Sequence, residues 1–135
     1  MTKWVSDFGI RILNIMIKRH HISIKNAFNG IKWAVRTQPN YRIHLFFSIL
    51  SLIASWYFRV SYFEFIIIIL LITIGFVIET INTGIEATTD AIDKQFRYDI
   101  KLAKDVSAAA MLLFAFGATV IACIIFIPKI ISLFL

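Results

Sequence analysis

The chain has 135 residues, of which 59% are hydrophobic and 16% are charged, and its mean hydropathy is +0.81. Soluble domains are nearer half apolar and one quarter charged, so this composition excludes intrinsic disorder and argues against a small water-soluble globule. The net charge is +6, but the basic residues cluster beside apolar runs, a pattern that favours a membrane surface over nucleic acid. The single Cys123 permits no intrachain disulfide.

The N-terminal segment, residues 1–41, is predicted to form helices at the membrane surface. Between residues 25 and 36, polar side chains recur at helical spacing on one side, and apolar side chains fill the opposite side. The polar side consists of Lys25, Asn29, Lys32 and Arg36. This pattern predicts an amphipathic helix that lies along the lipid headgroups. A basic anchor that only sets the topology explains the segment equally well. No cleavable signal is predicted, because Arg11 interrupts the first apolar stretch.

Three apolar segments follow, and transmembrane helices are predicted over residues 42–60, 62–93 and 105–128. Each is long enough to span a bilayer, because roughly 20 residues at about 1.5 Å per residue cover the hydrocarbon core. The second segment is almost free of polar atoms between residues 66 and 78, and then continues as a polar helix toward Asp93. Asp105 precedes the third apolar run and is expected to cap that helix. The whole chain is therefore predicted to be one all-α integral membrane domain.

The distribution of positive charge predicts the orientation of these spans. Eight basic residues, the last of them Arg42, precede the first apolar run at residues 43–58, only Arg59 lies between this run and the second, and four basic residues lie between the second and third runs. By the positive-inside rule, the N-terminus and the second link are cytoplasmic, and the C-terminus is outside. Lys129 alone opposes this assignment. The predicted location is the cytoplasmic (inner) cell membrane, which the chain crosses several times.

Acidic residues are concentrated in one short stretch of this basic chain. Six of the eight fall within 27 positions: Glu79, Glu86, Asp90, Asp93, Asp99 and Asp105. On a helix, a single polar stripe within roughly 60° of one direction contains Glu79, Asn82, Thr83, Glu86, Asp90 and Asp93. Like charges one turn apart repel, and the first of these carboxylates lies near the hydrocarbon boundary, so the stripe requires a cation to neutralise it.

A divalent metal ion is the expected cation. Oxygen donors without a Cys or His cluster suit Mg²⁺, which usually binds one or two carboxylates together with substrate phosphates. Neither a GxxxxGK[ST] loop nor a GxGxxG turn occurs, so basic side chains would hold the phosphates of a nucleotide. Four of them lie in the predicted cytoplasmic link: Lys94, Arg97, Lys101 and Lys104. Lys104 beside Asp105 is the pair we expect to take part.

Depth in the membrane predicts different roles for the two glutamates. Glu79 and Glu86 are two turns apart, about 10.5 Å along a helix, which is too far for easy chelation of one ion. Glu86, nearer water, is expected to hold Mg²⁺ and the triphosphate. Glu79, nearer lipid, suits a general base that takes a proton from a lipid hydroxyl. Alternatively, Glu79 is a polar plug that Asn82 or Thr83 satisfies in helix packing.

Two motifs resemble signatures of the prokaryotic diacylglycerol kinase family, which includes undecaprenol kinases. The string Glu79-Thr-Ile-Asn-Thr-Gly-Ile-Glu86, with Asp90, is similar to ExxNxxIExxxD, and Lys104-Asp105-Val-Ser-Ala-Ala-Ala110 is similar to KDxxxAA. Residues 26–36 and 40–44 also resemble the version of the family found in Gram-positive bacteria. The resemblance covers about residues 19–130.

The resemblance implies a homotrimer with one amphipathic surface helix and three spans per subunit, which transfers the γ-phosphate of ATP to undecaprenol or diacylglycerol. By motif position, Glu79 resembles the catalytic base, and Glu86 resembles a metal-binding carboxylate. The other implied active-site or nucleotide-contacting residues are Arg19, Asn82, Asp90, Lys104 and Asp105. Gln38 stands where many members have a second metal-binding Glu, and its amide oxygen can ligate Mg²⁺ without contributing charge.

Two other function classes stay open beside a lipid kinase that depends on ATP and Mg²⁺. A small proton-coupled transporter would also use an intramembrane carboxylate, but it would gain nothing from Lys104 and Asp105. A catalytically inactive membrane subunit is the other alternative, motivated by Gln38. None of the three interpretations involves nucleic acid.

Overall fold

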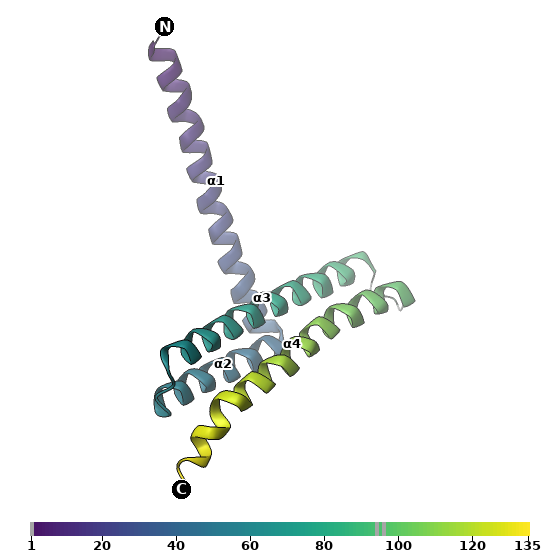
Figure 1. Ribbon diagram of the computed structural model, residues 1–135. Helices are drawn as coiled ribbons and strands as arrows, with labels where there is room; N and C mark the ends of the chain where they lie inside the picture. Colours follow the sequence, from purple (N-terminus) through teal and green to yellow (C-terminus); the bar gives the residue numbers. More distant parts are fainter. Residues whose placement is uncertain (1, 94, 96) are drawn as a thin grey trace. The chain divides into compact units, whose positions relative to one another are not determined.

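The computed structural model describes residues 2–93, 95 and 97–135, with side chains described from residue 12 onward in these ranges. These residues form the helices α1 (Thr2–Thr37), α2 (Pro39–Tyr57), α3 (Tyr62–Ile92) and α4 (Tyr98–Ile131), shown in Figure 1. The prediction of an all-helical protein is confirmed. The chain divides into two compact units, Met1–Thr37 and Gln38–Leu135.

The first unit is α1, one continuous helix of 36 residues. Lys25, Lys32 and Arg36 are exposed, and their spacing places them on the same side of the helix. Phe28 is also exposed, at 67%. A helix is therefore present in this segment, and its role as an amphipathic helix along the lipid headgroups stays a prediction.

The second unit begins with α2, which starts earlier than the predicted residue 42. Pro39 occupies the first turn, where its fixed φ angle suits a helix and its missing N–H costs nothing. Gln38 is the N-cap and is extended, with φ −98° and ψ 114°, as expected for a residue before proline. The helix ends at Tyr57, and Arg59 in the following turn has a positive φ of 49°.

A capping box starts α3. The Ser61 hydroxyl accepts a hydrogen bond from the backbone N–H of Glu64 at 3.3 Å, and the Glu64 carboxylate accepts one from the backbone N–H of Ser61 at 2.6 Å. This reciprocal pair satisfies two donors that a helix start would otherwise leave free. From there α3 runs without interruption to Ile92, so its apolar and polar halves belong to one rod.

The prediction that Asp105 caps the last helix is wrong. The N-cap of α4 is Arg97, and Asp105 lies inside the helix, where it pairs with Lys101 one turn earlier. The helix extends beyond the apolar run because such i,i+4 ion pairs, and Asp99 near the positive end of the helix dipole, favour helix in water as well.

Among the described helices, α3 and α4 are long and apolar enough to cross a membrane. A helix of 31 residues, such as α3, is about 46 Å long and exceeds the roughly 30 Å hydrocarbon core. Each of these helices is therefore longer than the hydrocarbon core requires. The first turns of α2 contain Arg42 and His44, so its role as a third span stays a prediction.

Helices α2, α3 and α4 lie side by side, with α3 packed against both of the others (Figure 1). At the end where α2 turns into α3, Lys129 of α4 pairs with Glu64 of α3 at 3.1 Å. Midway, Gly75 of α3 allows the Phe114 ring of α4 to approach, because an added Cβ would lie 2.7 Å from that ring.

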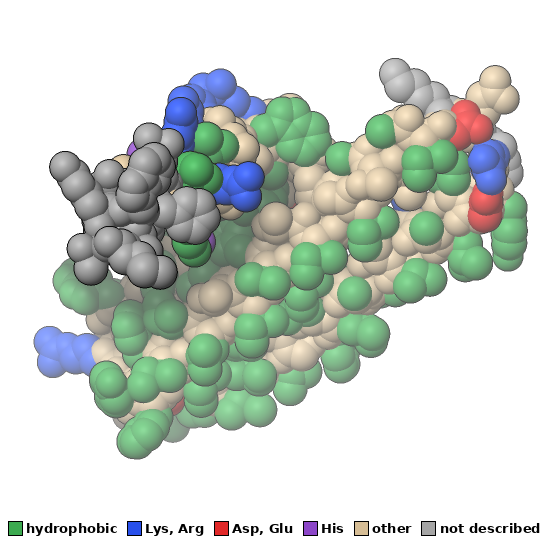
Figure 2. All heavy atoms as spheres, turned by 90° about the horizontal axis from the view of Figure 1, so that it is seen from above, with side chains coloured by type: hydrophobic (Ala, Val, Ile, Leu, Met, Phe, Trp, Pro, Cys, Tyr) green, Lys and Arg blue, Asp and Glu red, His purple; other side chains and the backbone are tan. Residues whose placement is uncertain are grey.

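The surface of the second unit is dominated by hydrophobic side chains. Figure 2 shows them along the visible body of the bundle, with acidic and basic side chains at the end where α3 and α4 are joined. Phe63, Leu113 and Phe116 are more than 70% exposed. Such a large apolar surface is unusual for a soluble protein and is suited to lipid.

Candidate functional site

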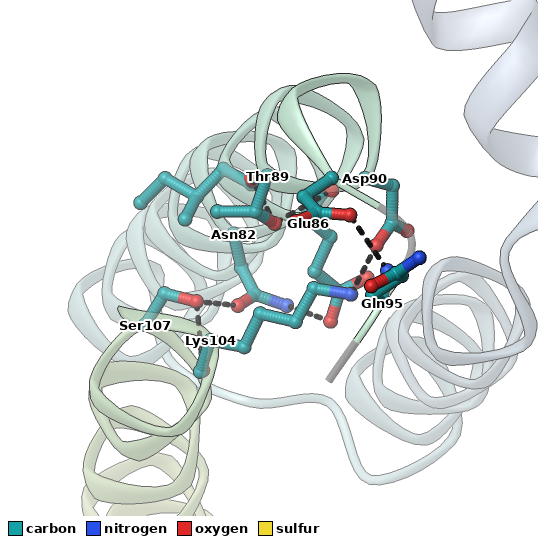
Figure 3. A network of polar contacts seen from close by, with 9 residues as sticks. Asn82, Glu86, Thr89, Asp90, Gln95, Lys104 and Ser107 are labelled. Carbon is teal, nitrogen blue, oxygen red and sulfur yellow. Dashed lines mark hydrogen bonds and ion pairs between the residues drawn. The ribbon is translucent and has the colours of Figure 1, made fainter. Parts of the chain in front are cut away.

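The candidate site lies between α3 and α4, near the end where residues 93–97 join these helices (Figure 3). Exposure rises along the predicted stripe of α3. Glu79 and Asn82 are only 1% and 4% exposed, Glu86 is half-buried, and Asp90 is exposed. The stripe thus passes from the protein interior into solvent, as its spacing predicts.

Asn82 is the centre of a polar network that joins the two helices. Its Oδ1 accepts a hydrogen bond from Ser107 Oγ of α4 at 2.6 Å, and its Nδ2 donates to Glu86 Oε1 at 3.4 Å. Thr89 hydroxyl donates to the backbone carbonyls of Ile85 and Glu86. The network holds one side of the Glu86 carboxylate from within the protein, and the half-buried position leaves the group within reach of solvent.

The aqueous end of the site is lined by ion pairs. Lys104 Nζ of α4 pairs with Asp90 Oδ1 of α3, and Lys101 Nζ pairs with Asp105 at 2.5 Å. Lys104 and Asp105 are therefore neighbours in sequence with different ion-pair partners, and their joint role in phosphate binding stays a prediction. At Asp90, the cation that relieves the repulsion along the stripe is Lys104.

Arg97, another of the basic residues expected to hold phosphates, pairs with Asp99 at 2.6 Å on the exposed start of α4. Lys94 lies outside the described residues. Among the described members of this basic set, Lys104 is the one that pairs with a carboxylate of the stripe, and its role in nucleotide binding stays a prediction.

Glu79 is the most deeply buried polar side chain in the described part of the chain. Its Oε2 has no hydrogen-bond partner among those residues. Asn82 and Thr83 are the partners expected in the polar-plug interpretation, but among the described residues neither is hydrogen-bonded to this oxygen, and Asn82 is bonded to Ser107 and Glu86 instead. Because buried polar groups are nearly always paired, an orphaned carboxylate oxygen calls for an external partner or a chemical role.

The donor set near Glu86 fits a magnesium ion brought in with phosphates. No group of three or more His, Cys, Asp and Glu side chains that could hold a metal by itself occurs in the described residues. Mg²⁺ does not require such a group, because one or two carboxylates suffice when phosphates complete the coordination. Lys104 beside the stripe can balance the phosphate charge.

Gln38 is not joined to this network by any described contact, and Arg19 belongs to the other compact unit. Gln38 caps α2, one turn before Tyr41, whose hydroxyl lies 3.4 Å from Thr80 Oγ1 of α3. Since α2 and α3 are antiparallel, Gln38 lies nearer the aqueous end than Tyr41 does. Arg19 is an exposed residue of α1. The roles of both residues in metal or nucleotide binding stay predictions.

Sequence reasoning missed Ser107 as a site residue. It lies within the Lys104–Ala110 motif, one turn after Lys104, and its spacing places it on the same helix face. That spacing was the available signal. Which residue of α3 it would meet depends on the relative position of the two helices, which one helix alone does not reveal.

Comparison with known proteins finds relatives over most of the chain. The model of the prokaryotic diacylglycerol kinase family matches residues 25–126. Undecaprenol kinase of Bacillus subtilis is 35% identical over 113 residues, which make up 84% of this chain and 92% of that protein. Diacylglycerol kinase of Synechocystis sp. is 28% identical over 113 residues, 83% of this chain and 65% of that protein. The family match includes every candidate site residue except Arg19.

Proposed function

The chain belongs to the prokaryotic diacylglycerol kinase family and is a membrane lipid kinase, and we propose that it uses ATP and Mg²⁺ to phosphorylate a lipid alcohol. The observation that carries this proposal is the position of Glu79. A buried carboxylate with an unpaired oxygen stands at the apolar end of a polar row that leads to Lys104 and solvent. Such a row can bring a polyphosphate close to a hydroxyl held in the membrane.

The roles that we propose for these residues differ with their depth in the membrane. Glu79 accepts the proton of the lipid hydroxyl. Glu86, with Gln38, would hold Mg²⁺, which when bound offsets the charge of the phosphates. Asn82 orients the polar row between these two carboxylates. The nucleotide is held by the remaining residues of the proposed set, namely Arg19, Asp90, Lys104 and Asp105. Phosphoryl transfer asks mainly for positioning and charge neutralisation, which these side chains can supply.

Undecaprenol is the acceptor that we propose first. The Bacillus subtilis relative, named undecaprenol kinase, is 35% identical and is covered over 92% of its length. Diacylglycerol is the second candidate, because the Synechocystis relative is named diacylglycerol kinase. Both lipids present a primary hydroxyl at the membrane interface, so the same base and phosphate site could serve either.

The working unit that we propose is a homotrimer in the cytoplasmic membrane, with three spans per subunit and the N-terminus inside. A single chain already buries Glu79 and Asn82, so these two residues do not require a neighbouring subunit. Glu86 and Asp90 remain open on one side. A second subunit could close the site there and exclude water from the transferred phosphoryl group.

The proposal is tested with the purified protein, radiolabelled ATP, Mg²⁺ and a panel of lipid alcohols. We expect Mg²⁺-dependent transfer of label to undecaprenol, with diacylglycerol as the next acceptor. Transfer to diacylglycerol alone would reverse the order of the two candidates. Absence of transfer to every lipid alcohol, from protein shown to be folded, would contradict the proposed reaction.

A further inference from the structure

We propose that Ser107 is a positioning residue, which fixes the side-chain amide of Asn82 and, through it, the carboxylate of Glu86. This inference rests on the proposed function, because it concerns the site assigned above to Mg²⁺ and the nucleotide. Figure 3 shows the three side chains in sequence, with Ser107 reaching from α4 to Asn82 on α3.

Ser107 and Glu86 together determine which way the amide of Asn82 faces. Ser107 and Asn82 are 8% and 4% exposed, so solvent does not compete for their hydrogen bonds. The Glu86 carboxylate can only accept, so Nδ2 of Asn82 faces it and donates to Oε1 at 3.4 Å. The Oδ1 atom then faces α4, where it accepts a hydrogen bond from the Ser107 hydroxyl at 2.6 Å.

Without the hydroxyl donor, the buried Oδ1 of Asn82 would have no hydrogen-bond partner among the described residues, and the amide would be held only by its contact with Glu86. The Asn82 side chain would then be free to turn toward another partner, and the Glu86 carboxylate would lose its internal donor. Because the bond to Glu86 is long, its orienting effect depends on how firmly Asn82 itself is held.

Ser107 also lies 3.0 Å from the carbonyl oxygen of Lys104, one turn earlier in α4. A serine inside a helix often donates only to such a carbonyl, which would make the residue purely local. The hydroxyl has one proton, and the contact with Asn82 is the shorter of the two. Ser55 provides the comparison: it is 3% exposed and donates to the Ser51 carbonyl of its own helix at 2.6 Å.

The experiment compares Ser107→Ala with the matched control Ser55→Ala, which removes an equally buried hydroxyl. We expect Ser107→Ala to raise the KM for Mg-ATP by about tenfold, as for loss of one hydrogen bond to a site group, with the KM for the lipid unchanged. Ser107→Thr keeps the hydroxyl and should restore the KM. Ser55→Ala should behave as wild type. Binding of a fluorescent ATP analogue without lipid should weaken in parallel in Ser107→Ala.

A double-mutant cycle with Asn82→Ala tests whether Ser107 acts through Asn82. We expect the effect of Ser107→Ala to disappear when Asn82 is already absent. Additive effects, an unchanged KM for Mg-ATP, or an equal rise in both KM values with a lower melting temperature would overturn the inference. The outcomes based on KM can be measured only if the wild-type protein is active. An inactive wild type would instead contradict the proposed function, and the nucleotide-binding comparison between Ser107→Ala and Ser55→Ala would still test the inference.

Discussion

At the scale of single residues, Glu79 and Glu86 differ in what surrounds them. Both belong to α3 and lie two turns apart, but the side chain of Glu79 is 1% exposed and that of Glu86 is held by Asn82 at the half-buried part of the row. The buried carboxylate of Glu79 is available to take a proton from a lipid hydroxyl in the membrane. The carboxylate of Glu86, which lies near solvent, is available to a hydrated metal ion and phosphates.

Replacing Glu79 by Gln removes the proposed base and preserves the shape of the side chain. We expect turnover to fall by about 10²-fold or more, because general-base catalysis contributes on that order. The protein should stay folded, since no hydrogen bond of Oε2 is lost. Phosphate transfer and thermal unfolding are measured on the same sample. Turnover equal to wild type would remove Glu79 from its catalytic role.

Lys104 is predicted to serve the nucleotide, and Lys104→Met tests this by removing the charge and keeping an apolar stem. The pair with Asp90 is partly exposed, so its loss should change the free energy of unfolding by no more than about 1 kcal/mol. The KM for ATP should rise at least tenfold. Lys129→Met is the control, because it breaks the Lys129–Glu64 pair at the opposite end of the bundle. An equal rise in the KM for ATP in the two variants would show that the effect comes from losing any positive charge and not from Lys104 in particular.

The candidate residues on α3 could be selected from sequence because helical spacing alone places Glu79, Asn82 and Glu86 on one face. Their hydrogen-bonding and ion-pairing partners on α4 could not be selected in this way. The Lys104–Asp90 pair and the Ser107–Asn82 bond both depend on how far α4 is shifted along α3. Adjacent residues in the chain, such as Lys104 and Asp105, point to different sides of a helix, so their separate partners Asp90 and Lys101 do not follow from the motif.

At the scale of elements, Gly75 allows a short distance between α3 and α4. An added Cβ at this position would lie 2.7 Å from the Phe114 ring, closer than ordinary side-chain contacts. Gly75 is one turn before Glu79 in the same helix. The close approach of the two helices therefore occurs next to the site, and any separation there would also move Ser107 away from Asn82.

Gly75→Leu is expected to push α3 and α4 apart, with a loss of stability of about 1–3 kcal/mol from overpacking and a loss of activity. Adding Phe114→Ala should recover part of both, because it removes the ring that the leucine would meet. Gly117→Ala is the control, since nothing lies within 4 Å of a Cβ at that position. Thermal unfolding and turnover are measured for all four proteins. Absence of recovery in the double variant would show that Phe114 does not set the helix spacing.

Helix ends were harder to predict than helix interiors. The apolar runs identified the interiors, but hydrophobicity only marks the part of a rod that faces lipid. Helix α4 begins at Tyr98, before the apolar run that follows Asp105, because a local ion pair and the helix dipole favour the helix there. Pro39 likewise starts α2 before its apolar run begins.

At the scale of the whole molecule, the site and the basic residues belong to the same predicted side of the membrane. The link between α3 and α4, where the polar row reaches solvent, contains basic residues, and the short turn between α2 and α3 contains only Arg59. ATP is a cytoplasmic substrate in the proposed reaction. The positive-inside rule thus predicts that the open end of the row lies on the cytoplasmic side, where the nucleotide is available.

Cysteine labelling tests this orientation, because Cys123 is the only cysteine in the chain and can be replaced by Ser. In that background, Arg59→Cys should react with a membrane-impermeant maleimide on sealed right-side-out vesicles, and Gln95→Cys should react only after permeabilisation. Both positions are exposed on the protein, so accessibility depends on the side of the membrane. Retained kinase activity of each variant serves as the control for correct insertion. Labelling of Gln95→Cys in sealed vesicles, with Arg59→Cys protected, would place the row of carboxylates on the side without ATP and would be incompatible with the proposed reaction.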